Sequence, residues 1–160
     1  MKRVMFIGQA MPRSKSHPHD WPSLNKWLYS IGITDLDIKN NFYYSALVDY
    51  FPGSKNGSHL VPTPAEILKE KPRLYQNLLD FKPEIIVPIG KLSIAECLCQ
   101  KLIPLNKTIG QSYFSDPYHL LGRPVTIIPL PHPSGASTWR HHPANKILLN
   151  SALNLIRQLF

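Results

Sequence analysis

The chain has 160 residues and a formal net charge of +8, with a pI near 9.6. This length fits one domain, and the excess of basic residues favours a polyanionic partner. No apolar run approaches the ~18 residues of a membrane span, and none resembles a secretory signal. We therefore expect a cytoplasmic, monomeric protein that forms a single domain over residues 1–160 and does not enter a membrane.

The basic residues gather at the two ends of the sequence. No acidic residue precedes Asp20, and none follows Asp116. The basic residues of these two segments are Lys2, Arg3, Arg13, Lys15, Arg123, Arg140, Lys146 and Arg157. If the two ends meet in the fold, they form one positive face suited to phosphate groups.

Apolar periodicity predicts strands that alternate with helices. The predicted strands are at 4–7, stopping at Gly8, at 41–48, at 84–89, stopping at Gly90, and at 125–129. The predicted helices are at 23–31, ending before Gly32, from after Thr63 toward Asp80, at 92–102 and at 144–159. Each strand is followed by one of these helices. The start at Thr63 is the clearest, because Pro64 and Glu66 complete a helix-capping signature.

This alternation predicts a three-layer α/β/α sandwich with a central, mostly parallel four-stranded sheet. In such sheets a ligand binds beyond the carboxyl ends of the strands. The segments that follow the predicted strands are GQAMPRSKS, SALVDYFPG, IGK and PLPHPSGAS. We therefore expect the functional site where these segments meet.

Two of these segments carry recognisable motifs. GQAMPR follows the first strand and HPSGAS follows the last, with PTPAEI and KPEIIVPIGKLSIAECL between them. In this order they resemble the uracil-DNA glycosylase superfamily from residue 4 to about residue 159, and its thermostable-type bacterial branch in particular. The resemblance implies a protein that binds DNA and hydrolyses the N-glycosidic bond of a flipped-out deaminated base, uracil or a related one, in base excision repair. A nucleotide- or phosphomonoester-handling α/β protein would have the same predicted fold.

The resemblance also implies catalytic roles. His132 would donate a hydrogen bond to the leaving base, and Gln9 would position a water molecule or the base. Ala10 stands where the best-known branch has an aspartate that orients the attacking water. A carboxylate that activates water would then come from elsewhere, and Asp20 and Asp49 are the candidates that the sequence places near the site.

Other residues are expected to contact the base. Ser45 stands where the superfamily has an asparagine that reads the edge of the base, and Ala10 would border the same space. Phe42 is an aromatic residue that would stack on the flipped base, and Tyr43 and Trp21 are alternatives. Because Ala10 and Ser45 lack the usual polar groups, a catalytically weak or inactive relative that binds DNA or senses damage is the alternative to an active enzyme.

The second motif is expected to bind DNA. Small residues there let backbone N–H groups approach phosphate oxygens, and basic residues neutralise them. The expected DNA-binding residues are Ser134, Gly135, Ala136, Ser137, Arg13 and Arg140. Ala136 stands where the superfamily often has a large apolar wedge that fills the gap left by the flipped base.

We predict no metal and no cofactor. The thermostable-type branch has a four-cysteine iron–sulfur cluster, whereas this chain has only Cys97 and Cys99, which we expect to fill the core. A zinc site is the alternative, but the available histidines lack the spacing of a closed site. They are His17, His19, His132, His141 and His142.

Overall fold

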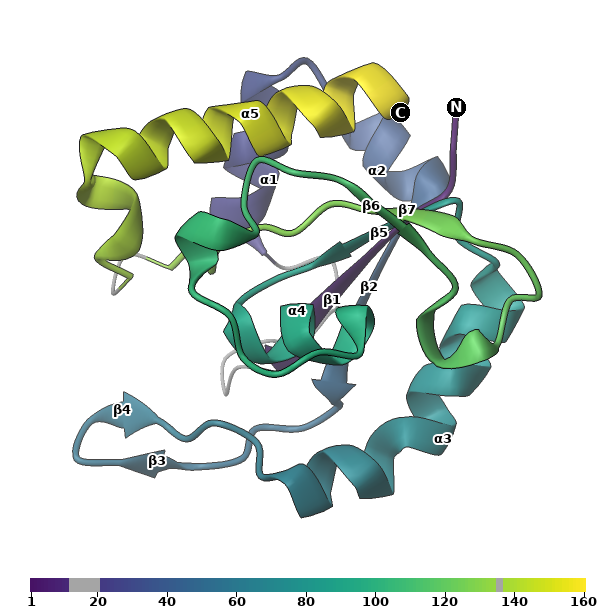
Figure 1. The fold of residues 1–160 in the computed structure, drawn as a ribbon, viewed down its shortest axis with the longest axis vertical. Helices are drawn as coiled ribbons and strands as arrows, with labels where there is room; N and C mark the ends of the chain where they lie inside the picture. The colour runs from purple at the N-terminus through teal and green to yellow at the C-terminus, as the bar shows by residue number, and fades with distance from the viewer. Residues whose placement is uncertain (12–20, 135–136) are drawn as a thin grey trace.

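The computed structural model of the chain describes residues 1–11, 21–134 and 137–160. Within them, five strands form one sheet and two more form a separate hairpin (Figure 1). The strands are β1 (Val4–Ala10), β2 (Phe42–Val48), β3 (Ser54–Lys55), β4 (Ser58–His59), β5 (Ile85–Pro88), β6 (Tyr113–Ser115) and β7 (Val125–Ile127). The helices are α1 (Pro22–Ser30), α2 (Asp35–Asn41), α3 (Pro64–Phe81), α4 (Lys91–Leu98) and α5 (Pro143–Leu159), with short 3-10 turns η1 (Leu105–Lys107), η2 (Pro117–His119) and η3 (Trp139–His141).

The sheet has the strand order β2-β1-β5-β7-β6. The first four of these strands run parallel, and β6 pairs with β7 in the antiparallel direction. The predicted α/β fold with a mostly parallel sheet is therefore confirmed, although the sheet has five strands rather than four. The additional strand, β6, is three residues long, which is too short to show an alternating pattern in the sequence.

Helices cover both faces of the sheet. Alternate residues of β1 point to opposite faces, so Phe6 packs with one cluster of apolar side chains and Ile7 packs with another. The first cluster contains residues of α1, α2 and α5, the second contains residues of α3, and α4 contributes Ile94 to the first and Cys97 to the second. Figure 1 shows these two groups of helices on opposite sides of the sheet, so the order is helix, sheet, helix.

Local signals explain where the helices begin and end. Thr63 and Glu66 form the predicted capping box at the start of α3. The start of α2 has the same arrangement, with Thr34 and Asp37, but this helix is seven residues long and the sequence analysis did not predict it. Helix α4 ends at Leu98, earlier than expected, because Cys99 adopts a left-handed conformation with φ of 51°.

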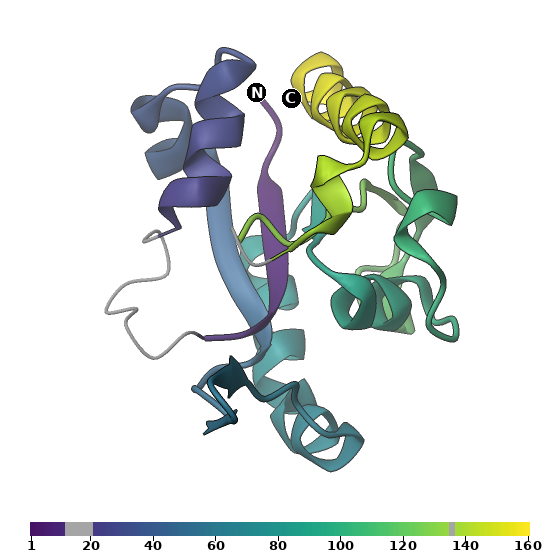
Figure 2. The same cartoon turned by 90° about the vertical axis from the view of Figure 1, so that its left-hand side faces the viewer.

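The two ends of the chain lie side by side in both views (Figures 1 and 2). They meet at the amino end of β1, where the Phe42 ring of β2 also contacts the ring of the terminal Phe160. Arg123 belongs to this end as well, since it donates a hydrogen bond to the Pro83 carbonyl just before β5. Part of the predicted positive face is therefore at the amino ends of the strands, whereas a ligand is expected at their carboxyl ends. None of the described helices has the length and apolar character of a membrane span.

The capping box of α3 gives a testable contribution to stability. We expect Thr63→Ala to lower the free energy of unfolding by about 1 kcal/mol, because the backbone N–H of Glu66 loses its acceptor. Urea unfolding would measure this change. Thr138→Ala is the matched control, since Thr138 precedes η3 without a side-chain capping bond, and its effect should stay below about 0.5 kcal/mol. Equal losses of unfolding free energy in the two variants would contradict the assignment of Thr63 as the helix cap.

Candidate functional site

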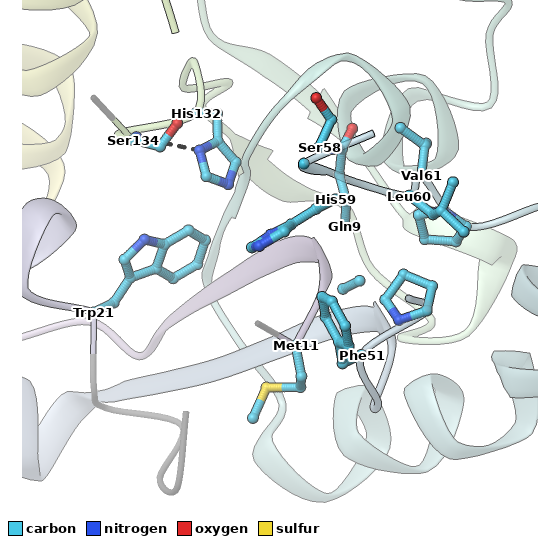
Figure 3. Close-up of a pocket in the computed structure, with 14 residues that line it drawn as sticks. Gln9, Met11, Trp21, Phe51, Ser58, His59, Leu60, Val61, His132 and Ser134 are labelled. Carbon is cyan, nitrogen blue, oxygen red and sulfur yellow. Dashed lines mark hydrogen bonds between the residues drawn. The ribbon is translucent and has the colours of Figure 1, made fainter. Parts of the chain in front are cut away.

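A pocket of about 580 Å³ lies at the carboxyl end of β1, between the segment that follows β7 and the β3–β4 hairpin. Figure 3 shows the side chains that line it. The lining residues that matter for its chemistry are Gln9, Ala10, Trp21, Phe51, Ser58, His59, His132 and Ser134. Three of the segments expected to meet at this edge therefore do so, those that contain Gln9, Phe51 and His132.

Backbone hydrogen bonds bring Gln9 and His132 to the same pocket. The Ile89 N–H donates to the Ile7 carbonyl at 2.9 Å, and the Gly90 N–H donates to the Leu130 carbonyl at 2.9 Å. Gln9 and His132 each come two residues after a bonded carbonyl. The two side chains therefore leave the sheet on either side of the segment in which β5 continues to Gly90.

The His132 ring is oriented by its own loop. Its Nδ1 accepts a hydrogen bond from the Ser134 backbone N–H at 3.2 Å. A nitrogen that accepts a hydrogen bond carries no proton, so the proton of the neutral ring is on Nε2. Neutral His132 is thus a hydrogen-bond donor through Nε2.

Trp21 forms an aromatic wall beside this histidine. The centroids of the two rings are 5.8 Å apart, with a tilt of 53°. Gly8 makes room for the indole, because a Cβ at Gly8 would lie 3.1 Å from the Trp21 ring. Of the aromatic residues considered for base stacking, Trp21 is the one that the structure places in the pocket.

The Gln9 amide is oriented by the start of α4. Its Oε1 accepts a hydrogen bond from the Leu92 backbone N–H at 3.2 Å. An N–H group can only donate, so this contact also distinguishes the oxygen of the amide from its nitrogen. The Nε2 group is the part of Gln9 that can contact a ligand, and it is a donor without basic character.

Carboxylates do not line this pocket in the described parts of the chain. Ala10 borders it with a methyl group. Asp49 is exposed beyond the end of β2, where its backbone N–H donates to the Glu70 carboxylate at 3.3 Å. Asp20, the other candidate for water activation, lies outside the described residues.

Ser45 does not line the pocket, because its side chain points to α3. The register pairs it with Ile7, whose side chain packs on the face covered by α3 and α4. Its hydroxyl oxygen accepts hydrogen bonds from Asn77 Nδ2 at 3.2 Å and from Arg73 Nη1 at 3.4 Å. The expectation that Ser45 meets the base beside Gln9 and His132 therefore disagrees with the structure.

Phe42 is also placed elsewhere. It begins β2, at the end of the strand far from the pocket, and its buried ring packs on Phe6 and Phe160. An aromatic residue in a strand points either to the core or to solvent, and the sequence did not distinguish this core position from a stacking position. Tyr43 packs on Phe81 at the end of α3 and does not line the pocket either.

Arg73 joins α3 to the carboxyl end of β2. Its Nη2 donates to the Ala46 carbonyl at 2.7 Å and to the Leu47 carbonyl at 3.3 Å. Its Nε donates to Glu70 at 2.9 Å, and this bond holds the pKa of the Glu70 carboxyl below its usual range. These contacts make Arg73 a structural residue of the sheet edge.

The residues predicted to bind DNA are only partly described. Ser134 lines the pocket, and the Ser137 N–H donates to its carbonyl at 3.2 Å. The half-buried Arg140 donates from Nη1 to the Pro133 carbonyl at 3.1 Å, so it braces the loop that carries His132. The other three predicted residues, Arg13, Gly135 and Ala136, lie outside the described residues.

The β3–β4 hairpin and its His59 were not predicted from the sequence, and Phe51 was not singled out within the segment SALVDYFPG. Asn56 and Gly57 have φ angles of 51° and 76°, as the two central residues of a tight hairpin turn require. The Asn-Gly pair signals such a turn, but the flanking residues are polar and exposed and show no strand pattern. His59 stacks edge-on against Phe51, with ring centroids 5.2 Å apart, and both residues line the pocket.

The two thiols differ in their surroundings. Cys97 is buried, as expected, and burial raises the pKa of its thiol. Cys99 is exposed rather than part of the core, because it follows the end of α4. Outside residues 12–20 and 135–136, no three His, Cys, Asp or Glu side chains gather as metal ligands would. His17 and His19 of the zinc alternative fall within the first of these gaps.

Gly90 is under two constraints that can be tested. Its φ of 85° and ψ of 160° suit glycine, and a Cβ there would lie 3.2 Å from the Gln9 amide. We expect Gly90→Ala to lower the free energy of unfolding by about 3 kcal/mol in urea unfolding.

Gly32→Ala is the matched control for this change. Gly32 has a similar φ of 86°, but nothing lies within 4 Å of a Cβ at this position. Gly32→Ala should lower the free energy of unfolding by about 1 kcal/mol. A loss for Gly90→Ala no larger than that for Gly32→Ala would show that the contact with Gln9 is unimportant.

Comparison with known proteins identifies a family for this chain. The sequence model of the uracil DNA glycosylase superfamily matches residues 1–154, which is nearly the whole chain. No curated protein matches the sequence. The match includes both strand ends that carry Gln9 and His132, and the chain belongs to the uracil DNA glycosylase superfamily.

Proposed function

We propose that the protein is a DNA glycosylase that hydrolyses the N-glycosidic bond of a deaminated base, uracil or a related one, which is flipped out of DNA into the pocket. The observation that carries this proposal is the arrangement of His132, whose Nε2 carries the proton of the neutral ring, and Gln9, whose amide nitrogen is a donor, in one pocket. Superfamily membership supports a glycosylase-like function on DNA.

Donors suit this reaction because the leaving base becomes negatively charged. When the glycosidic bond breaks, its electron pair moves to the base and charge develops on the base oxygens. A preorganised donor at such an oxygen typically contributes a factor of about 10²–10³ to the rate. His132 is our candidate for this donor, and Gln9 is our candidate for a second contact to the base or to water.

Trp21 supplies a surface on which a base can stack. A base has two flat faces, and an indole ring beside it contributes roughly 1–3 kcal/mol of binding free energy. The pocket volume of about 580 Å³ lies within the usual range for small-ligand pockets. This volume accommodates a pyrimidine or a purine, so both classes of deaminated base belong in the test.

The loop that follows β7 is our candidate for holding the DNA strand. Ser134, Ser137 and Arg140 lie there together with His132, and the net charge of +8 favours binding to a polyanion. A flipped nucleotide must be held by its flanking phosphates while its base is in the pocket. We propose that these residues bind some of the flanking phosphates and that Arg13, Gly135 and Ala136 also contact the DNA backbone.

One observation favours a second candidate function. No carboxylate lines the pocket in the described ranges, and Ala10 stands where an acid orients water in the best-known branch. A relative that binds DNA or senses damaged bases without excising them would need the pocket and the positive charge but not a group that activates water.

An excision assay separates these two functions. The purified protein is incubated with oligonucleotides that carry uracil, hypoxanthine or xanthine, as single strands and in mismatches, and abasic sites are then cleaved with alkali. We expect strand breaks at one or more of these bases, and His132→Ala should lower the rate by about 10²–10³-fold because the leaving base loses its donor.

His142→Ala is the matched control. His142 also accepts a hydrogen bond at Nδ1 from the backbone N–H two residues later, but it does not line the pocket, so its rate should stay within about threefold of the wild type. DNA binding should weaken steeply with added salt in all three proteins. Salt-sensitive binding without strand breaks at any base would favour the second function and contradict the first.

A further inference from the structure

We propose that His59, on β4, is the residue that takes a proton from the attacking water. This role rests on the proposed glycosylase function and adds a catalytic group to the same pocket. Neither the motifs nor the superfamily match points to this residue. The proposal rests on which hydrogen-bond donors and acceptors the side chains of this pocket present to a ligand.

The other nitrogen and amide acceptors in the pocket are already engaged. Gln9 Oε1 accepts the Leu92 N–H, and His132 Nδ1 accepts the Ser134 N–H. The amide oxygen of Gln9 is not a base, and the ring nitrogen of neutral His132 that could take a proton is engaged by the Ser134 N–H. A general base must be a basic acceptor within reach of the water.

His59 is the lining residue that meets this requirement. Carboxylates are absent from the described lining, and the hydroxyls of Ser58 and Ser134 are far less basic than an imidazole. A neutral imidazole has one ring nitrogen that accepts a proton. Among the side chains described in this pocket, His59 is the one suited to general-base catalysis.

The hairpin positions the backbone of His59, and Phe51 packs against its ring. His59 pairs with Ser54 across the hairpin, and the next residue, Leu60, donates its N–H to the Gly53 carbonyl at 2.9 Å. The Phe51 ring meets the imidazole edge-on, with an interplanar angle of 83°. His59 is exposed, and the Phe51 ring is the described side chain that packs against its imidazole.

The two histidines reach the pocket from different parts of the fold. His132 follows β7, whereas His59 belongs to the hairpin, and Figure 3 shows the His59 side chain directed into the space between Trp21 and Phe51. A base held against His132 and Trp21 leaves the hairpin side of the pocket for water. His132 would thus act on the leaving base, and His59 would act on the attacking water.

The chemical step balances without any further reactant. The water oxygen bonds to C1′ of the sugar as the C1′–N bond breaks, and the electron pair of that bond leaves with the base. One water proton passes to the acceptor nitrogen of His59, while the Nε2–H of His132 donates a hydrogen bond to the anionic base oxygen. His59 then releases its proton to solvent, and the free base takes up a proton from solvent.

The test compares His59→Ala and His59→Gln with the wild type on the base that the wild type releases. Single-turnover rates measure the chemical step, the Kd for a duplex with an abasic site measures DNA binding, and urea unfolding measures stability. His119→Ala is the control, because His119 is exposed and does not line the pocket.

We expect both His59 variants to lose about 10²–10⁴-fold in single-turnover rate, since glutamine keeps hydrogen bonding but is not a base. Their Kd values and the rate of the control should stay within about threefold of the wild type. Added imidazole should restore part of the rate of His59→Ala, because a free base can occupy the space that the side chain leaves.

Three results would overturn the role of His59 while leaving the glycosylase function intact. They are a wild-type rate in His59→Ala, a wild-type rate in His59→Gln, and a loss of rate that is matched by an equal loss of DNA affinity. A wild-type protein that excises none of the tested bases would overturn the glycosylase function, and the role of His59 with it.

Discussion

The site depends on a short row of backbone hydrogen bonds at the carboxyl edge of the sheet. Ile89 donates to Ile7, Leu130 donates to Pro88, and Gly90 donates to Leu130, so that β1, β5 and the segment after β7 are joined where the strands end. Gln9 and His132 come two residues beyond this row on either side of Gly90. Because only backbone groups take part, this spacing does not depend on which side chains occupy the pocket. The same framework can therefore hold different chemical groups, and here it holds Gln9 and Ala10.

The second consequence of this row is the chemical character of the pocket. Backbone N–H groups follow two of these strand ends: Leu92 in the first turn of α4 donates to Gln9 Oε1, and Ser134 donates to His132 Nδ1. Acceptance at Nδ1 leaves the neutral His132 ring a donor through Nε2, and the bond to Oε1 orients the Gln9 amide so that its Nε2 group is distinguished as the donor. Donors stabilise negative charge on a leaving base but cannot activate water. A group that activates water must then come from outside the row, and the β3–β4 hairpin is the described element that brings a basic side chain to this pocket.

Several elements could be predicted from the sequence because their signals are local. The capping box at Thr63 needs only residues of one helical turn, and it is present at the start of α3. The apolar runs of β1 and β5 indicate strands buried on both faces, as the two clusters of core side chains require. Strand β6 and the two hairpin strands show no strand pattern, since they are two or three residues long and mostly exposed, and only the Asn56-Gly57 pair signals the turn between β3 and β4. Their strands form because a partner strand or a tight turn is available, which is a property of the folded chain.

The sequence by itself determined the fold class, the positions of the two motifs at strand ends and the expectation that Gln9 and His132 would meet. These follow from periodicity and from the rule that parallel strands end at one edge. Only the tertiary structure decided which side chains share the pocket. Ser45 and Phe42 both lie on β2, but the first points to α3 and the second packs on Phe160 at the end of the strand far from the pocket. Trp21 and His59 enter the pocket instead. The physical reason is that the face and the end of a strand at which a residue lies depend on register and strand bounds, and these are set by contacts between segments far apart in the chain.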